Sequence, residues 1–237
     1  MKRILAIFGI LALFVSCQTE MELTDSIDSY KFEESYESLN MEFIGFKAGD
    51  AQWDDVSRIH WGQMKTTEPI RNFGSVLQNS GIATDASDIY VGVYSFEELQ
   101  KYKSKCRYVT YVEIPDFQLK YKNNMTTLES GAVLCMFIFL APIGLPLLCV
   151  PAKTNMYFKT SANIFVYDTQ ENELVYKKTV FITEEKTFKG LFGYGGTFTK
   201  KSSEAGEQKV YAYWANVIAN KALEEYANIG KSPLFQK

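Results

Sequence analysis

Apolar residues alternate with polar ones, or run together, in five stretches whose pattern predicts β-strands. These stretches are residues 41–46, 89–94, 107–121, 156–167 and 174–183. Pro115 interrupts the third stretch, which is therefore two strands or an edge strand with a bulge, because proline cannot donate to a strand ladder. Polar residues 168–172 separate the last two stretches and predict a hairpin turn.

Two further stretches carry helix signals. Residues 67–81 begin with a threonine that can cap a helix, followed by an acid and a proline, and end in glycine. Ile70, Phe73 and Leu77 recur there at helical spacing. Residues 203–228 predict a second helix, which ends before a glycine and has one apolar face. This face consists of Val210, Trp214, Val217, Ile218 and Leu223.

The remaining segments order these elements into one fold. We expect a loop containing Trp53, His60 and Trp61 after the first strand, and a glycine-rich loop at residues 189–196. The chain would then run strand, helix, two strands, apolar insert, two strands, helix. This order predicts a single α+β domain over residues 39–230, followed by a tail at 231–237. Its mixed or antiparallel sheet would have about five to six strands and two packed helices.

The N-terminus has the pattern of a secretory signal peptide over residues 1–16. Two basic residues precede an uncharged run, Ile4–Val15, and Ser16 is a small residue at the cleavage point. The sequence Phe14-Val-Ser-Cys17 resembles the lipobox of bacterial lipoproteins, with Phe14 where leucine is usual. The alternative is an ordinary signal peptide that contains a cysteine.

The lipoprotein resemblance implies that Cys17 is acylated, for example with palmitate, and anchors the mature chain in a membrane of the bacterial cell envelope. Gln18 follows this cysteine, and the absence of aspartate there favours the outer membrane over inner-membrane retention. Residues 17–38 then form the lipidated end and an acidic tether, because this stretch is too polar to order itself. Its acids after Gln18 are Glu20, Glu22, Asp25, Asp28, Glu33, Glu34 and Glu37.

The segment from Gly131 to Ala152 contains 22 residues and no charge. It is long enough to span a bilayer, but a single span would put the strands before and after it on opposite sides of the membrane. A second reading is a re-entrant or membrane-apposed hairpin broken at Pro142 and Pro146, which lie near its middle. A third is a buried hairpin in the core of the domain. In the second reading, the residues that contact the membrane or a partner are Leu134, Phe137, Ile138, Phe139, Leu140, Ile143, Leu145, Leu147 and Leu148.

Composition and charge exclude some functions. The chain has 25 basic and 28 acidic residues, and its basic signal peptide is removed on maturation. The mature protein therefore lacks the excess of positive charge that nucleic-acid binding needs. Its aromatic content of 15%, with 17 Phe and 15 Tyr, favours β structure.

No motif in the sequence carries recognisable catalytic or cofactor chemistry. His60 is the only histidine, so neither a hydrolase triad nor a zinc site of the usual kind has an obvious base or ligand set. Cys106 has basic neighbours that would lower the pKa of its thiol, which makes it a candidate reactive cysteine. The glycines at 190–196 lack the Lys-Ser/Thr of a phosphate loop. We therefore expect no catalytic residues, no metal and no cofactor.

Cys135 and Cys149 flank Pro142 at equal distance, so a hairpin folded there would bring them level. Such a hairpin would allow a disulfide between them in an oxidising envelope, which would leave Cys106 as a free thiol. The alternative is that both are small apolar residues of an apolar run.

The chain also resembles small envelope lipoproteins: the curli-secretion and penicillin-binding-protein-activator lipoproteins, and the auxiliary lipoproteins of lipid-transporting ABC systems. The matching residues are Leu77, Ser80-Gly81 and Asp88–Val93. The resemblance implies a non-enzymatic accessory or scaffold for a membrane machinery, with membrane lipid and possible envelope proteins as partners. A carrier of a hydrophobic or lipid ligand is the first alternative, and an unrecognised hydrolase is the second.

Overall fold

The computed structural model describes residues 30–37, 39–49, 53–87, 102–123, 151–193 and 200–235. Its contacts divide the chain into two compact units. The larger unit consists of Ile27–Leu119, Phe158–Glu184 and Tyr211–Lys237, and the smaller one of Met1–Ser26, Lys120–Tyr157 and Glu185–Val210.

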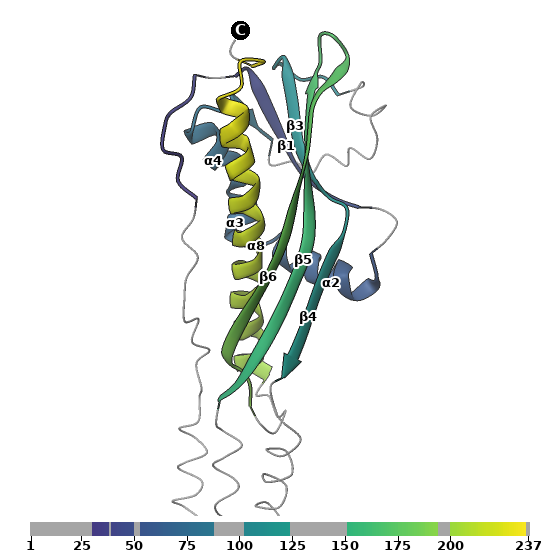
Figure 1. Cartoon of the computed structure of the whole chain (residues 1–237), viewed down its shortest axis with the longest axis vertical. Helices are drawn as coiled ribbons and strands as arrows, with labels where there is room; N and C mark the ends of the chain where they lie inside the picture. Colours follow the sequence, from purple (N-terminus) through teal and green to yellow (C-terminus); the bar gives the residue numbers. More distant parts are fainter. Residues whose placement is uncertain are drawn as a thin grey trace, which may run out of the picture. The chain divides into compact units, whose positions relative to one another are not determined.

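The fold is α+β with a mixed sheet of six strands, as the sequence predicted (Figure 1). The strands are β1 (Met41–Ala48), β2 (Asp85–Ala86), β3 (Tyr108–Ile114), β4 (Phe117–Asn123), β5 (Pro151–Asp168) and β6 (Glu173–Gly193). The sheet order is β2-β1-β3-β5-β4, and β6 pairs with β5. Strand β1 is parallel to β2 and β3, whereas β3 and β5 are antiparallel.

The helices are α2 (Asp55–Met64), α3 (Glu68–Arg71), α4 (Phe73–Asn79) and α8 (Lys200–Gly230). Helix α2 corrects the expectation of a loop around Trp53, His60 and Trp61. The residue before it, Asp54, is its N-cap: the Asp54 side chain accepts a hydrogen bond from the backbone N–H of Ser57 at 2.6 Å.

The predicted helix over residues 67–81 is present as two short helices, α3 and α4, which meet at Asn72. The three apolar residues that predicted it, Ile70, Phe73 and Leu77, are buried. The second predicted helix is confirmed as α8, and all five residues of its predicted apolar face are buried.

The sequence also located most of the strands. Pro115 separates β3 from β4, so the two-strand reading of residues 107–121 is the right one. The hairpin is confirmed as β5 and β6, with a turn at residues 169–172. Strand β6 continues to Gly193, so residues 189–193 are strand instead of the expected loop. The predicted strand at 89–94 lies outside the described residues.

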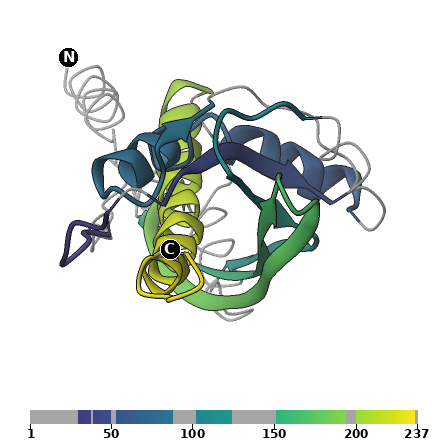
Figure 2. The same ribbon diagram turned by 90° about the horizontal axis from the view of Figure 1, so that it is seen from above.

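The core of the larger unit lies on one face of its strands, called here the helix face. Phe43 of β1 contacts Phe73 of α4 and Tyr226 of α8, with ring centroids 5.1 Å and 6.3 Å apart. Phe158 of β5 stacks on Trp214 of α8 at 4.7 Å. Helices α4 and α8 therefore cover the same face (Figure 2). The Tyr226 hydroxyl lies 2.7 Å from that of Thr110, which satisfies two buried polar groups within this core.

A bulge in β1 aligns two phenylalanines on the helix face. The register of β1 against β3 shifts between Phe43 and Phe46, and Gly45 has a φ of 115°. Only glycine adopts this backbone conformation readily. The extra residue lets Phe46, like Phe43, reach Phe73, with ring centroids 4.9 Å apart.

Candidate functional site

Most residues with a predicted role lie outside the described part of the chain. They are the lipid-attachment Cys17, the nine apolar contact residues between Leu134 and Leu148, and the cysteine pair Cys135 and Cys149. Their roles, including the disulfide, stay predictions. What the structure does describe is where the chain leaves the sheet before the apolar segment and where it re-enters the sheet after it.

The chain leaves the sheet at the end of β4 and re-enters it at the start of β5. These two strands are neighbours in the sheet order, and both points belong to the smaller unit. In Figure 1, β4 ends at the same end of these strands at which β5 begins. Strand β3, before the segment, also pairs with β5, after it, with Tyr111 opposite Phe165. A single span would have separated these strands, so their pairing argues against that reading of residues 131–152.

The larger unit contains a cavity of about 320 Å³ between β1 and the helices α3 and α4, which we call the β1 groove. Phe43, Phe46 and Ile70 supply its apolar part. Exposed Lys65 and Arg71 also line it and bring two positive charges. Its volume is at the lower end of the range for small-molecule sites. The β1 groove therefore combines an apolar part with two cationic side chains.

On the opposite face of β1, which we call the outer face, Glu42 holds a polar network. The carboxylate is 8% exposed and accepts hydrogen bonds from the hydroxyls of Tyr102 and Ser104, both at 2.5 Å. The Ser104 oxygen in turn accepts from the backbone N–H of Cys106 at 2.9 Å. Burial, followed by the hydrogen bond to Glu42, raises the pKa of Tyr102 to about 12. Glu42 thus attaches residues 102–106 to the sheet.

The structure corrects the expectation that Cys106 is activated. Burial raises the pKa of its thiol, and the negative charges of Glu42 and Asp85 raise it further. Arg107, one of the two basic neighbours expected to lower the pKa, has its Nε atom 2.9 Å from Asp168. Cys106 is a free, buried thiol, and its raised pKa disfavours the reactive thiolate.

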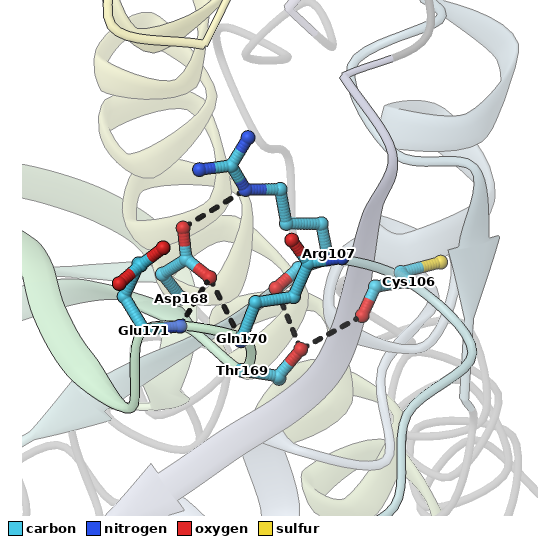
Figure 3. A network of polar contacts seen from close by, with 6 residues as sticks. All are labelled: Cys106, Arg107, Asp168, Thr169, Gln170 and Glu171. Atoms are coloured by element: carbon cyan, nitrogen blue, oxygen red, sulfur yellow. Dashed lines mark hydrogen bonds and ion pairs between the residues drawn. The ribbon is translucent and has the colours of Figure 1, made fainter.

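Asp168 is the second buried carboxylate of this unit, at 2% exposed (Figure 3). Its Oδ1 atom accepts hydrogen bonds from the backbone N–H groups of Gln170 and Glu171 at 2.9 Å and 3.2 Å. Burial opposes its ionisation, but these bonds and the Arg107 guanidinium outweigh it, so the pKa of Asp168 is below its usual value. The Thr169 hydroxyl donates to the carbonyl of Arg107 at 2.8 Å. This network fixes the β5–β6 turn to the start of β3.

His60 does not meet Cys106 in a catalytic pair. Its Nδ1 atom lies 2.9 Å from the hydroxyl of Tyr211 on α8, and the two rings are 5.7 Å apart. The backbone of Cys106 bonds instead to the hydroxyls of Ser104 and Thr169. Among the described residues, moreover, no three His, Cys, Asp or Glu side chains are grouped so that they could hold a metal ion.

The sequence indicated neither the β1 groove nor the Glu42 network. The isolated Gly45 within an apolar strand stretch was the available signal, because such a glycine often marks a bulge. No sequence pattern marked Lys65 or Arg71 as residues of a site. None of the helices in the described ranges is long and apolar enough to cross a membrane.

No known family matches the sequence, and a search of curated proteins finds no match. Similar solved structures include a neuraminyllactose-binding hemagglutinin homolog from Helicobacter pylori, 9% identical, with a TM-score of 0.34 over 84% of this chain and 97% of that one. A minor lipoprotein from Acinetobacter baumannii is 9% identical, with a TM-score of 0.32 over 82% and 93% of the two chains. A lipoprotein from Caulobacter crescentus is 12% identical, with a TM-score of 0.34 over 80% and 93%. At TM-scores below 0.5 these likenesses do not establish a shared function.

Proposed function

We propose that the chain is a non-enzymatic bacterial envelope lipoprotein, anchored through Cys17 in the outer membrane. Its apolar segment, residues 131–151, would contact the bilayer or a membrane-embedded partner protein, so that the folded part serves as a scaffold for a membrane machinery. The lipobox-like sequence ending at Cys17 supports the anchor. The partners of Cys106 and His60 support a role without catalysis, because both side chains are engaged in packing and hydrogen bonding.

The observation that carries the proposal is the adjacency of β4 and β5 in the sheet. Because the chain leaves and re-enters one sheet between neighbouring strands, an excursion from there has to return to the side from which it left. This supports the hairpin over the single span. A hairpin with two prolines near its tip leaves backbone groups without partners, which favours a shallow position in the membrane or cover by a protein.

Metabolic palmitate labelling tests the anchor. We expect the full-length chain to take up label and the Cys17→Ala variant to lose it. Labelling of Cys17→Ala at the wild-type level would contradict the lipoprotein assignment and would move the acylation site to another cysteine.

Flotation with liposomes tests the contact separately. A chain that starts at Gln18, and so lacks the lipidated cysteine, should float with vesicles through its apolar segment. Phe139→Asp should abolish flotation because an ionised carboxylate is costly to bury in hydrocarbon. Val56→Asp is the matched control, since Val56 is 58% exposed on α2 and should tolerate the charge. Equal flotation of wild type and Phe139→Asp would refute membrane contact by this segment.

The β1 groove supports a second candidate function, carriage of an anionic amphiphile such as a fatty acid. Its apolar part matches an acyl chain, and Lys65 and Arg71 match a carboxylate or phosphate. A fluorescent fatty-acid analogue should bind the wild type, and Arg71→Glu should weaken binding about tenfold or more through charge reversal. Arg58→Glu, an exposed change on α2, is the control. Equal affinity of Arg71→Glu and Arg58→Glu would exclude this site.

A further inference from the structure

Strand β6 is an edge of the sheet in the larger unit. Within the described residues the sheet order gives it one neighbour, β5. Its side chains alternate between the two faces. Tyr176 donates to Glu225 of α8 on the helix face, whereas Thr179 donates to Asn163 of β5 on the outer face at 2.7 Å. An edge strand presents backbone N–H and C=O groups that can pair with another strand.

This edge combines an apolar centre with charges of opposite sign. Phe181 is 78% exposed, the highest value among the exposed large apolar residues of the described chain. Three positions before it is the exposed Lys178, and three positions after it is the half-buried Glu184. Lys178 and Glu184 share a face of the strand, because they are separated by an even number of residues.

We propose that β6 pairs antiparallel with β6 of a second copy of this chain, around a two-fold axis at Phe181. The two phenylalanines then lie opposite each other on the outer face. On the other face, Lys178 of each copy lies opposite Glu184 of its partner, which forms two symmetry-related ion pairs. The sheet becomes continuous across the two copies, and the surface is self-complementary, as a two-fold interface requires.

Charge complementarity selects this register. A two-fold axis perpendicular to the sheet keeps each side chain on its own face. The axis must therefore pass through a residue, and each change of register moves it from one residue to another. With the axis at Val180, Lys178 would face Ile182, and at Thr179 it would face Val180. Of these three axes, only the one at Phe181 places Lys178 opposite an acidic residue. Opposite charges in directly facing positions stabilise a strand pair.

Cysteine cross-linking of the full, lipid-anchored chain in bacterial envelope membranes tests the geometry. Phe181→Cys places two thiols on directly opposed residues, where the Cα separation of about 4.5–5.5 Å suits a disulfide. We expect a covalent dimer after mild oxidation, with peptide mass spectrometry locating the bond at residue 181. Thr183→Cys is the matched control: its counterpart lies about 13 Å away along the ladder and should not link.

A charge exchange tests the register without a cross-link. Lys178→Glu should weaken dimerisation roughly tenfold, because two attractive pairs become repulsive. The double variant K178E/E184K should restore it, since the opposite charges face each other again. Sedimentation equilibrium in detergent gives the dissociation constants. A monomeric wild type, equal linking at positions 181 and 183, or no recovery in the double variant would overturn the proposal.

Discussion

Glu42 and Asp168 are both buried carboxylates of the larger unit, but the chain satisfies them in different ways. Asp168 has a cation, Arg107, and two backbone N–H donors. The donors that reach Glu42 are the hydroxyls of Tyr102 and Ser104. A nearby cation favours the charged form of a carboxylate, and a charged carboxylate in turn raises the pKa of a nearby phenol or thiol.

The two buried carboxylates therefore have different electrostatic effects in this fold. Asp168 has a lowered pKa and fixes a turn, and the charge of Glu42 helps to raise the pKa values of Tyr102 and Cys106. Both attach an irregular segment to the sheet.

The largest expected effect comes from removing Asp168. Asp168→Ala leaves the N–H groups of Gln170 and Glu171 without their acceptor and should lower the free energy of unfolding by about 2 kcal/mol. We expect loss of the ion pair to add little to this decrease in the free energy of unfolding, because the Arg107 side chain is 34% exposed. Urea unfolding measures the change. The exposed Glu171→Ala is the control, and an equal loss in both variants would contradict the role of Asp168.

The pH dependence of stability sharpens the contrast. Because the pKa of Asp168 is lower in the folded state, its ionised form stabilises the protein above the unfolded value of about 3.9. This contribution is lost as the pH falls through the folded-state pKa. Wild type should therefore lose more stability than Asp168→Asn between pH 5 and pH 3. Parallel acid curves would show that Asp168 is not coupled to folding.

Glu42→Gln should have the smallest effect. It retains the shape of the side chain and one acceptor oxygen, so the free energy of unfolding should fall by about 1 kcal/mol. It also removes a negative charge beside Cys106 and should lower the pKa of that thiol. Alkylation of Cys106 across a pH series, followed by peptide mass spectrometry, detects the shift. Glu113→Gln on the same face is the control, and no difference between the two variants would contradict the coupling.

The sequence predicted the regular elements where one apolar pattern continued long enough. Both ends of helix α8 and the turn between β5 and β6 were predicted to within a few residues. Strands β5 and β6 extend further from that turn than predicted, to Pro151 and Gly193. Helix α2 was missed because its apolar residues do not lie on one face: Val56 and Ile59 are exposed at 58% and 63%, whereas Trp61 and Met64 are buried. Its capping residue, Asp54, was the signal that remained.

The candidate sites were less predictable, because their partners are far apart along the chain. Glu42 meets Tyr102 and Ser104 about 60 positions later, and Arg107 meets Asp168 at a similar separation. Composition and spacing do not reveal which of many acids and hydroxyls come together. The incorrect expectation for Cys106 has the same origin, since residues adjacent in sequence were taken as its electrostatic neighbours.

The central proposal is that residues 131–151 are the working part of the protein and lie outside its core. Among the described residues, the core includes side chains such as Trp214, Tyr226 and Phe73. Replacing 131–151 by a short Gly/Ser turn, followed by thermal and urea unfolding, tests this most directly. The account predicts a soluble protein that unfolds cooperatively, because β4 and β5 are neighbours and a turn can join them. Aggregation or loss of cooperative unfolding would contradict it and would show that the segment is a buried core hairpin.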